Sequence, residues 1–413
     1  MGLGLKKKSF TSLVVLFLYT LAIHLYHLGI KSLAALRHHK ALRWYQGRKD
    51  AKEFSMPPGW QSKNKIWIHS ASFGEYEMAK PIVSRLLEDE RNRIYVSFYS
   101  PSGFENIHFS DPRIHKFYLP IDLKSSLVPL LDKLQPDSAV FIKYEFWFNL
   151  LKQLKSRAIP YYFTSLHINE GSYLLRIPTF RNLIKSAKSL YCHNPHSIEI
   201  LEKSGFENLK VFGDSRVNKA LENLREERPD LQWVRKAKTI VFGSLLSSEI
   251  KMMAELIKRN PDYNYLIAPH DIDAGSLAEV VDKLTLPFTK LTEIKGTEIN
   301  NNILIINTLG DLKFLYSLAD VVYVGGGFGK GPHSIIEPLA YGTPTIIGPN
   351  IGHYPMARTL KRSGHLTVIE QESDLSAAID NLIETSSDYS EEVKAQISSL
   401  QVNLDPLIEE LSH

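Results

Sequence analysis

The stretch from Ala319 to Gly348 constrains the fold of this 413-residue chain more than any other. An apolar run at Val321–Val324 leads into positions 325–329, of which four are glycine, and then into a helical pattern expected to begin near His333. A strand, a glycine turn, a helix and a second strand in this order are typical of a parallel sheet covered by helices. The stretch therefore predicts an α/β protein.

The same stretch suggests a ligand site. A helix that begins directly after glycines offers unpaired backbone N–H groups and the positive end of its dipole, and both favour a phosphate. Glu337 falls in the first turn of the expected helix, where a carboxylate can accept hydrogen bonds from two vicinal hydroxyls, as on a ribose. We interpret the stretch as a nucleotide site, with an ordinary turn of a parallel sheet as the alternative.

Length and composition limit the class of protein. The chain is long enough for two α/β domains, and its 44% apolar and 23% charged residues are typical of a folded globular protein. The net charge of +4 is too small to indicate nucleic acid as a partner. The single cysteine, Cys192, excludes an intrachain disulfide framework and a thiolate metal cluster.

The N-terminal residues differ from the rest. Lys6–Lys8 precede a mostly apolar run from Phe10 to Ile30, and basic residues then continue while no acid precedes Asp50. The length and the flanking charge predict that residues 1–56 are a membrane anchor with a basic juxtamembrane segment, the remaining chain lying on the cytoplasmic side. A helix that lies in the membrane interface and a buried helix of a soluble domain are the alternatives.

Two series of short apolar runs, alternating with helical patterns, follow the anchor and predict strands. The first series is Lys65–His69, Arg93–Ser97, Phe117–Leu119, Ala139–Ile142, Tyr161–Phe163, Leu190–Cys192 and Leu209–Phe212. The second is Thr239–Phe242, Tyr265–Ile267, Ile303–Ile306, Val321–Val324 and Thr345–Ile347.

The charged stretch Asn218–Lys238 between the two series is interpreted as the interdomain connection. We therefore expect two doubly wound domains, residues 57–217 and 218–413, with ligands at the carboxyl ends of both sheets. The last helical pattern, Glu391–Leu411, is expected to be able to pack back on the first domain.

Three charged residues directly follow strands of the first series. Glu75 stands at a strand-to-helix turn, where a carboxylate can act as general base toward a hydroxyl. Glu145 follows another strand and is flanked by aromatic residues, and the Arg216 guanidinium could stabilise a departing phosphate. A first-turn acid that only favours the helix dipole is the alternative for Glu75, and a surface ion pair is the alternative for Arg216.

Together these motifs resemble the Kdo transferases, a family that moves 3-deoxy-D-manno-octulosonic acid (Kdo) from CMP-Kdo to a lipid A precursor. The segments that carry the resemblance are His69–Glu75, Glu145–Asn149, Gly213–Asn218, Gly243–Ser244, Ile267–His270 and the stretch from Ala319 to Gly348. The resemblance implies a GT-B fold of two facing Rossmann-like domains. It also implies an inverting, metal-independent enzyme of lipopolysaccharide core biosynthesis, on the cytoplasmic face of a bacterial inner membrane, with no cofactor besides its CMP-Kdo donor.

The resemblance assigns roles to single residues. Glu75 matches the base that deprotonates a primary hydroxyl of the glycolipid acceptor, lipid IVA, and Glu145 matches a second acid near the reaction centre. Arg216 stands where the family has a lysine assigned to transition-state stabilisation, which keeps the charge but changes its geometry. The positions that match CMP contacts are Pro269, His270, Leu309, Gly310, Asp311, Ser334, Ile335, Ile336 and Glu337.

Two donor-site motifs depart from the family pattern. The common Pro-Arg-His is Pro269-His270-Asp271 here, and Asn-Pro-Leu-Glu is Ser334-Ile335-Ile336-Glu337. A UDP-sugar-dependent transferase of the same fold, a non-hydrolysing nucleotide-sugar epimerase and a paralogue that only binds nucleotide are the alternatives. No set of His, Cys and carboxylate side chains has metal-ligand spacing, apart from the weak pair His38-His39.

Overall fold

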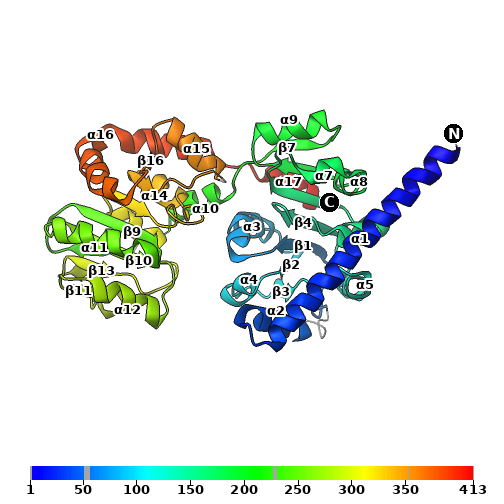
Figure 1. Ribbon diagram of the computed structural model, residues 1–413, viewed down its shortest axis with the longest axis horizontal. Helices are drawn as coiled ribbons and strands as arrows, with labels where there is room; N and C mark the ends of the chain where they lie inside the picture. The colour runs from blue at the N-terminus through cyan, green and yellow to red at the C-terminus, as the bar shows by residue number, and fades with distance from the viewer. Residues whose placement is uncertain (1, 51–55, 227–229, 353, 413) are drawn as a thin grey trace. The chain divides into compact units, whose positions relative to one another are not determined.

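The computed structural model describes residues 2–50, 56–226, 230–352 and 354–412. The chain divides into two units (Figure 1). Unit 1 comprises the chain up to Arg216 together with the residues from Val402 onward, and unit 2 comprises Val217–Gln401. The sequence placed the domain boundary between residues 217 and 218.

Unit 1 is built on a seven-stranded parallel sheet in the order β3-β2-β1-β4-β5-β6-β7. Its strands are β1 (Asn64–Ser70), β2 (Asn92–Phe98), β3 (Ile114–Tyr118), β4 (Ser138–Ile142), β5 (Tyr161–Leu166), β6 (Ser189–Cys192) and β7 (Leu209–Val211). Each apolar run of the first series thus coincides with a strand. The central strand β1 is buried on both faces, and its side chains alternate between them: Trp67 packs in one core, and Ile66 and Ile68 in the other.

Helices connect these strands and cover both faces of the sheet (Figure 1). They are α3 (Phe73–Leu86), α4 (Pro101–Asn106), α5 (Lys124–Leu134), α6 (Phe148–Ser156), α7 (Tyr173–Arg176), α8 (Pro178–Lys185) and α9 (Pro195–Lys203). Helix α3 follows β1 directly, so its first turn lies at the carboxyl end of the central strand. This is where a doubly wound sheet binds its ligands.

Unit 2 contains a second seven-stranded parallel sheet in the order β11-β13-β10-β9-β14-β15-β16, and a separate pair, β12-β8. The large sheet has β9 (Thr239–Leu245), β10 (Asn264–Pro269), β11 (Phe288–Lys290), β13 (Ile303–Ile305), β14 (Val321–Val324), β15 (Thr345–Ile347) and β16 (Thr367–Val368). The pair is β8 (Gln232–Trp233) and β12 (Glu298–Ile299). Strands β8, β11, β12 and β16 were not predicted because each is only two or three residues long and none lies at the centre of the sheet.

The helices of unit 2 are α10 (Arg216–Asn223), α11 (Ile250–Arg259), α12 (Ala274–Lys283), α13 (Leu312–Leu315), α14 (Ile336–Ala340), α15 (Pro355–Arg362) and α16 (Leu375–Ser399). The helix expected to begin near His333 begins instead at Ile336. Residues 331–335 have no regular structure, because the amides of Gly331 and His333 donate to Gly326 O and Gly325 O and fold the chain back onto the glycine loop. Glu337 does lie in the first turn of α14.

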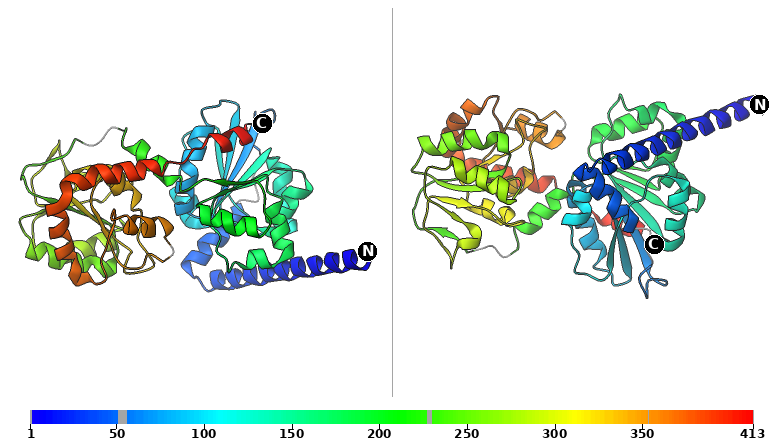
Figure 2. Two further views of the ribbon diagram at one scale, coloured as in Figure 1. Left: turned by 90° about the horizontal axis from the view of Figure 1, so that it is seen from above. Right: turned by 60° about the horizontal axis from the view of Figure 1, so that its bottom comes forward.

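The chain begins with two helices that belong to unit 1, α1 (Gly2–Ala35) and α2 (His39–Asp50). Within α1, Leu13–Ala35 is long and apolar enough to cross a membrane, by length and composition. Figure 2 shows that α1 runs along one side of unit 1.

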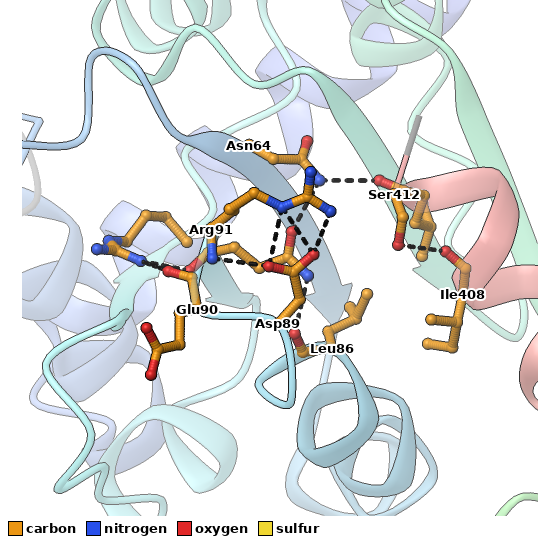
Figure 3. A network of polar contacts seen from close by, with 10 residues as sticks. Asn64, Leu86, Asp89, Glu90, Arg91, Ile408 and Ser412 are labelled. Carbon is orange, nitrogen blue, oxygen red and sulfur yellow. Dashed lines mark hydrogen bonds and ion pairs between the residues drawn. The ribbon is translucent and has the colours of Figure 1, made fainter.

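The chain ends with a short helix, α17 (Asp405–Leu411), that also belongs to unit 1. The continuous helical pattern expected over Glu391–Leu411 is therefore wrong, because α16 ends at Ser399 in unit 2 and α17 is a separate element. Asn64 Nδ2 donates to Leu411 O at 3.0 Å, which joins α17 to the start of β1. Figure 3 shows this region, where Arg91 forms a bidentate ion pair with Asp89 beside the end of the chain.

Candidate active site

The Glu75 carboxylate lies in the first turn of α3, at the carboxyl end of β1. Ser72 is the N-cap residue, and its backbone N–H donates to Glu75 Oε2 at 3.1 Å. This capping bond fixes the carboxylate near the strand end. Glu75 is half-buried.

Three neighbouring strands bring a second carboxylate close to Glu75. His69 is the next-to-last residue of β1, Ser97 lies in the adjacent β2, and Glu145 follows β4 on the other side of β1. His69 Nε2 lies 3.1 Å from Glu145 Oε2, and His69 Nδ1 lies 2.8 Å from Ser97 Oγ. Trp147 Nε1 donates to the same Glu145 oxygen at 2.7 Å.

Two indole groups position this network. The indole of Trp67 can only donate, and its Nε1 donates to Ser97 Oγ at 2.8 Å. His69 Nδ1 faces this hydroxyl and also Ser97 O, at 3.2 Å, so the ring proton can lie on Nδ1, toward the Ser97 carbonyl, or on Nε2, toward Glu145. In both tautomers the Trp147 N–H donates to the Glu145 carboxylate.

The surroundings of Glu75 change its acidity. Burial raises the pKa of Glu75, and the negative charge of Glu145 raises it further, whereas His69, Lys143 and the hydrogen bond from the backbone of Ala71 act in the opposite direction. A carboxylate with a raised pKa is a stronger base while it is still ionised at neutral pH. Glu75 thus lies beside a second acid, Glu145, whose negative charge favours the protonated form of Glu75.

Positive charge lies on the same side of unit 1. Burial, and next the charge of Arg216, lower the pKa of Lys143, while Asp214 and Glu75 raise it. Lys143 has a left-handed backbone conformation, with φ of 61°, which is unusual for lysine and turns the chain directly after β4. The guanidinium of Arg216 binds the buried carboxylate of Asp214 through Nε, at 2.9 Å, and through Nη2.

Sequence reasoning named Glu75, Glu145 and Arg216 in unit 1 but assigned no role to His69, Ser97, Lys143 or Trp147. Glu75 and Glu145 are within electrostatic range of each other, and Lys143 lies within range of both Glu75 and Arg216. The position of two of these residues in the sequence could have indicated them. His69 lies near the end of the buried strand β1 and Lys143 directly follows the buried strand β4, at the edge of the sheet that carries Glu75.

In unit 2 the glycine loop after β14 packs tightly on the protein itself. A Cβ at Gly325 would lie 2.4 Å from Ser244 O, and one at Gly327 would lie 2.4 Å from Gly348 N. These glycines are therefore required by close backbone packing.

A buried carboxylate holds this loop. Glu249 is fully buried, and its Oε1 accepts from Gly326 N at 2.9 Å and from the Tyr323 hydroxyl at 2.8 Å. Its Oε2 accepts from Leu246 N at 3.0 Å. Because the Gly326 amide already donates to Glu249, it is not part of an anion site, and Glu249 is a positioning residue that the sequence did not reveal.

Two histidine rings stack on each other next to the glycine loop. His270 follows β10, His333 follows the glycine loop, and their rings stack with centroids 4.2 Å apart and planes at 22°. Burial, and next the proximity of His270, lower the pKa of His333 to about 4, against the opposing effect of Asp271. His333 Nε2 is buried without a hydrogen-bond partner in the described part of the chain. The predicted contact His270 thus has a neighbour, His333, that the sequence analysis did not select.

The other predicted donor contacts differ in exposure. Ile335 and Ile336 are buried in the core, so only their backbone could meet a ligand, whereas Ser334 and Glu337 are half-buried. Pro269 ends β10 and is buried. Leu309, Gly310 and Asp311 form the turn after β13, in which Leu309 is 77% exposed and Asp311 accepts from the Thr308 hydroxyl.

Comparisons with known proteins agree with this arrangement. A family model described as "3-Deoxy-D-manno-octulosonic-acid transferase (kdotransferase)" matches residues 42–219, and one described as "Glycosyl transferases group 1" matches residues 246–398. A 3-deoxy-D-manno-octulosonic acid transferase of Haemophilus influenzae is 25% identical over 312 residues, which are 70% of this chain and 72% of the relative.

Two further similarities are informative. A bifunctional glycosyltransferase/methyltransferase of Fusobacterium nucleatum is 25% identical over 304 residues, or 68% of this chain, but the match spans only 47% of that relative. The crystal structure of UDP-GlcNAc 2-epimerase from Neisseria meningitidis bound to UDP-GlcNAc superposes with a TM-score of 0.56 over 84% of this chain and 99% of that one. At 13% identity this likeness shows the fold alone.

The two parallel-sheet units and the matched families define a glycosyltransferase of the GT-B class, which confirms the predicted fold class and the prediction of an enzyme. The family model over residues 42–219 and the similar transferases support a Kdo transferase, that is, an enzyme of glycosyl transfer in lipopolysaccharide synthesis.

Proposed function

We propose that the protein transfers Kdo from CMP-Kdo to the lipid A precursor, lipid IVA, with inversion at the anomeric carbon. The acceptor is a glycolipid, so the reaction takes place at a membrane, which we place at the cytoplasmic face of a bacterial inner membrane. The observation that carries the proposal is the half-buried Glu75 carboxylate, whose pKa is raised by burial and by Glu145.

Glu75 acts as the base. It removes the proton from a primary hydroxyl of the acceptor, whose oxygen forms a bond to the anomeric carbon of Kdo. The bond between that carbon and the phosphate oxygen breaks on the opposite side, and CMP leaves with the electron pair. Glu145, held by His69 and Trp147, strengthens the base through its negative charge.

Cationic groups compensate the negative charge of the departing CMP. In unit 1 these are Lys143 and Arg216, of which Arg216 already binds Asp214 through two of its nitrogens. In unit 2 the donor contacts fall on His270, on the turn Leu309–Asp311, and on Ser334 and Glu337. CMP-Kdo carries a single phosphate, so we propose that protein groups suffice and that no divalent metal takes part.

The test is a transfer assay on the purified full-length protein. It is supplied with an enzymatic source of CMP-Kdo and with lipid IVA, in the presence of a chelator, and the lipid is followed by mass spectrometry. We expect mass increments of one or more Kdo residues, and none for Glu75→Gln, which preserves size but cannot accept the proton. The number of increments also counts the sugars transferred.

Two results would contradict the proposal. Release of UDP from a UDP-sugar without transfer from CMP-Kdo would indicate the UDP-sugar transferase, and interconversion of free UDP-sugars would indicate the epimerase. Restoration of activity only by added Mg²⁺ would retain the transferase but overturn its metal independence.

A further inference from the structure

Helix α1 has one face that is docked on unit 1. Val15, Leu16 and Tyr19 pack against the core of the unit, where α1 contacts α6 and α8. The Tyr19 ring meets Phe148 edge-on at a centroid distance of 5.3 Å and Phe180 at 5.8 Å. This part of α1 is therefore not a free segment that leaves the protein.

Polar groups lock the same face. The Tyr19 hydroxyl donates to Asp122 Oδ2 at 2.7 Å, and Asp122 is 1% exposed. Asp122 also accepts from the amides of Asn149 and Leu150 at the start of α6, at 3.0 and 2.8 Å, and Thr20 lies within hydrogen-bond distance of the Asn149 side chain. Pulling α1 away would cost the bonds of Tyr19 and Thr20 and leave the buried Asp122 carboxylate with one donor fewer.

The opposite face of α1 carries exposed apolar side chains at helical spacing, with the exposed His24 at its margin. They are Val14, Phe17, Leu18, Leu21, Leu25 and Leu28, with exposures of 39–67%. Residues spaced by three and four positions form one continuous stripe along a helix. Soluble proteins rarely expose an apolar stripe of this length to water. The stripe therefore marks a surface that lipid or another protein covers.

The charged side chains near α1 indicate whether the stripe meets the interior or the surface of a bilayer. Helices α6 and α8, which pack against α1, carry exposed cations at Lys152, Lys155 and Lys185. If α1 crossed a bilayer while docked, these lysines would enter the hydrocarbon, which is strongly unfavourable. At the level of lipid headgroups the same lysines, with Lys31 and Arg37 beyond the stripe, would instead meet anionic phosphates.

We propose that α1 does not cross the membrane but lies in the plane of an anionic bilayer surface, with the stripe Val14–Leu28 facing the acyl chains and the Tyr19 face docked on unit 1. The globular unit is thereby held with the α6 and α8 side against the headgroups. This inference concerns membrane attachment, does not depend on the proposed reaction, and is tested without donor or acceptor.

The test is a depth profile. Single cysteines replace Phe17, Leu21, Leu25 and Leu28 in the full-length protein, are labelled with a nitroxide, and are added to vesicles of phosphatidylglycerol and phosphatidylethanolamine. Cys192 is fully buried, and labelling of the unmodified protein is measured to show that it does not react. Label depth is obtained from relaxation by oxygen and by a water-soluble nickel chelate.

We expect all four labels at one depth, roughly 5–10 Å below the headgroups, and a reference label at Lys152→Cys at the level of the headgroups, shallower than these four. A spanning helix would instead give depths that change by roughly 16 Å between positions 17 and 28, at 1.5 Å per residue, and this result would overturn the proposal.

Two further outcomes distinguish a second copy of the chain from an anionic bilayer as the surface that covers the stripe. Labels shielded from both reagents, with strong coupling between nitroxides of different chains, would mean that a second copy covers the stripe and would contradict the proposal. A loss of vesicle binding of at least about tenfold on replacing phosphatidylglycerol by neutral phosphatidylcholine would support attachment through anionic headgroups, since each lysine near the surface contributes about 1 kcal/mol.

Discussion

The chemistry of Glu75 depends on neighbours that are distant in sequence. Its own position follows from the N-cap at Ser72, but its pKa is raised by burial and next by Glu145, which is held beside His69 and Trp147. These groups meet because β2, β1 and β4 are adjacent in the sheet. The acidity of a single carboxylate at a strand-to-helix turn thereby depends on residues from other strands.

Replacing Glu145 should therefore shift the pH dependence of transfer. Catalysis requires ionised Glu75, so activity is lost as the pH falls through the pKa of Glu75, which burial and Glu145 raise. Glu145→Gln removes one negative charge at nearly constant volume, and we expect the acidic limb of kcat/KM to move to lower pH. The measurement is kcat/KM as a function of pH for the wild-type protein and the variant.

The matched control for this experiment is Glu88→Gln, because Glu88 lies just after the end of α3 and its side chain is 61% exposed. Its profile should coincide with that of the wild type. An acidic limb that stays in place, or moves to higher pH, in Glu145→Gln would show that Glu145 does not act on the base through its charge.

The glycine loop after β14 and the helix α14 show which local features a sequence pattern predicts and which it does not. The strand Val321–Val324 and the place of Glu337 in a first helical turn were correctly predicted from this stretch. The start of α14 was not, because the hydrogen bonds that fold residues 331–335 back onto the loop depend on the tertiary structure. The stacked pair of His270 and His333 was also beyond reach, since the two residues follow different strands of the sheet.

Glu249→Ala should loosen this loop and weaken nucleotide binding. The change leaves the amides of Gly326 and Leu246 and the Tyr323 hydroxyl without their acceptor, at roughly 1–3 kcal/mol for each buried group. We expect the affinity for CMP, measured by isothermal titration calorimetry, to fall at least about tenfold. Glu255→Ala, on α11 with a side chain 56% exposed, should bind like the wild type. Unchanged CMP affinity in Glu249→Ala would separate the loop from the donor site.

Helix α17 should stabilise unit 1 through Glu410. Its carboxylate accepts from the Ser189 hydroxyl at 2.8 Å, from the Tyr191 hydroxyl at 3.1 Å and from Lys210. Burial raises the pKa of Glu410, but these hydrogen bonds, led by Lys210, outweigh it, so the net pKa is lowered. The stabilisation is thus present above the ordinary carboxyl pKa and is lost as the pH falls through the lowered value.

We expect Glu410→Ala to lower the thermal midpoint of unit 1 by an amount that corresponds to roughly 1–3 kcal/mol, measured by scanning calorimetry at neutral pH. The adjacent Glu409→Ala removes an equal charge from an exposed position of the same helix and serves as the control. Equal midpoints for the two variants would refute a role of the Glu410 network in stability.

The two units of the molecule differ in the number of chain segments that form them. Unit 2 is one continuous segment, Val217–Gln401, whereas unit 1 is completed only by the last residues of the chain. The sequence indicated two domains of similar size from its two series of strands, but the exact division between α16 and α17 rests on side chains that pack across long sequence separations. Val402, Leu407 and Leu411 are buried in the core of unit 1.

This topology predicts that the two units respond differently to truncation. A fragment of residues 217–401 should unfold cooperatively and still bind CMP, because its core is complete and most of the proposed CMP contacts lie within it. A fragment that ends at Arg216 should fail to unfold cooperatively, since it lacks Val402, Leu407 and Leu411, whose burial contributes roughly 1.5–3 kcal/mol each. Joining residues 402–413 to this fragment through a flexible linker should restore its transition. A cooperative transition for the fragment without α17, or none for residues 217–401, would show that the units do not fold independently along this division.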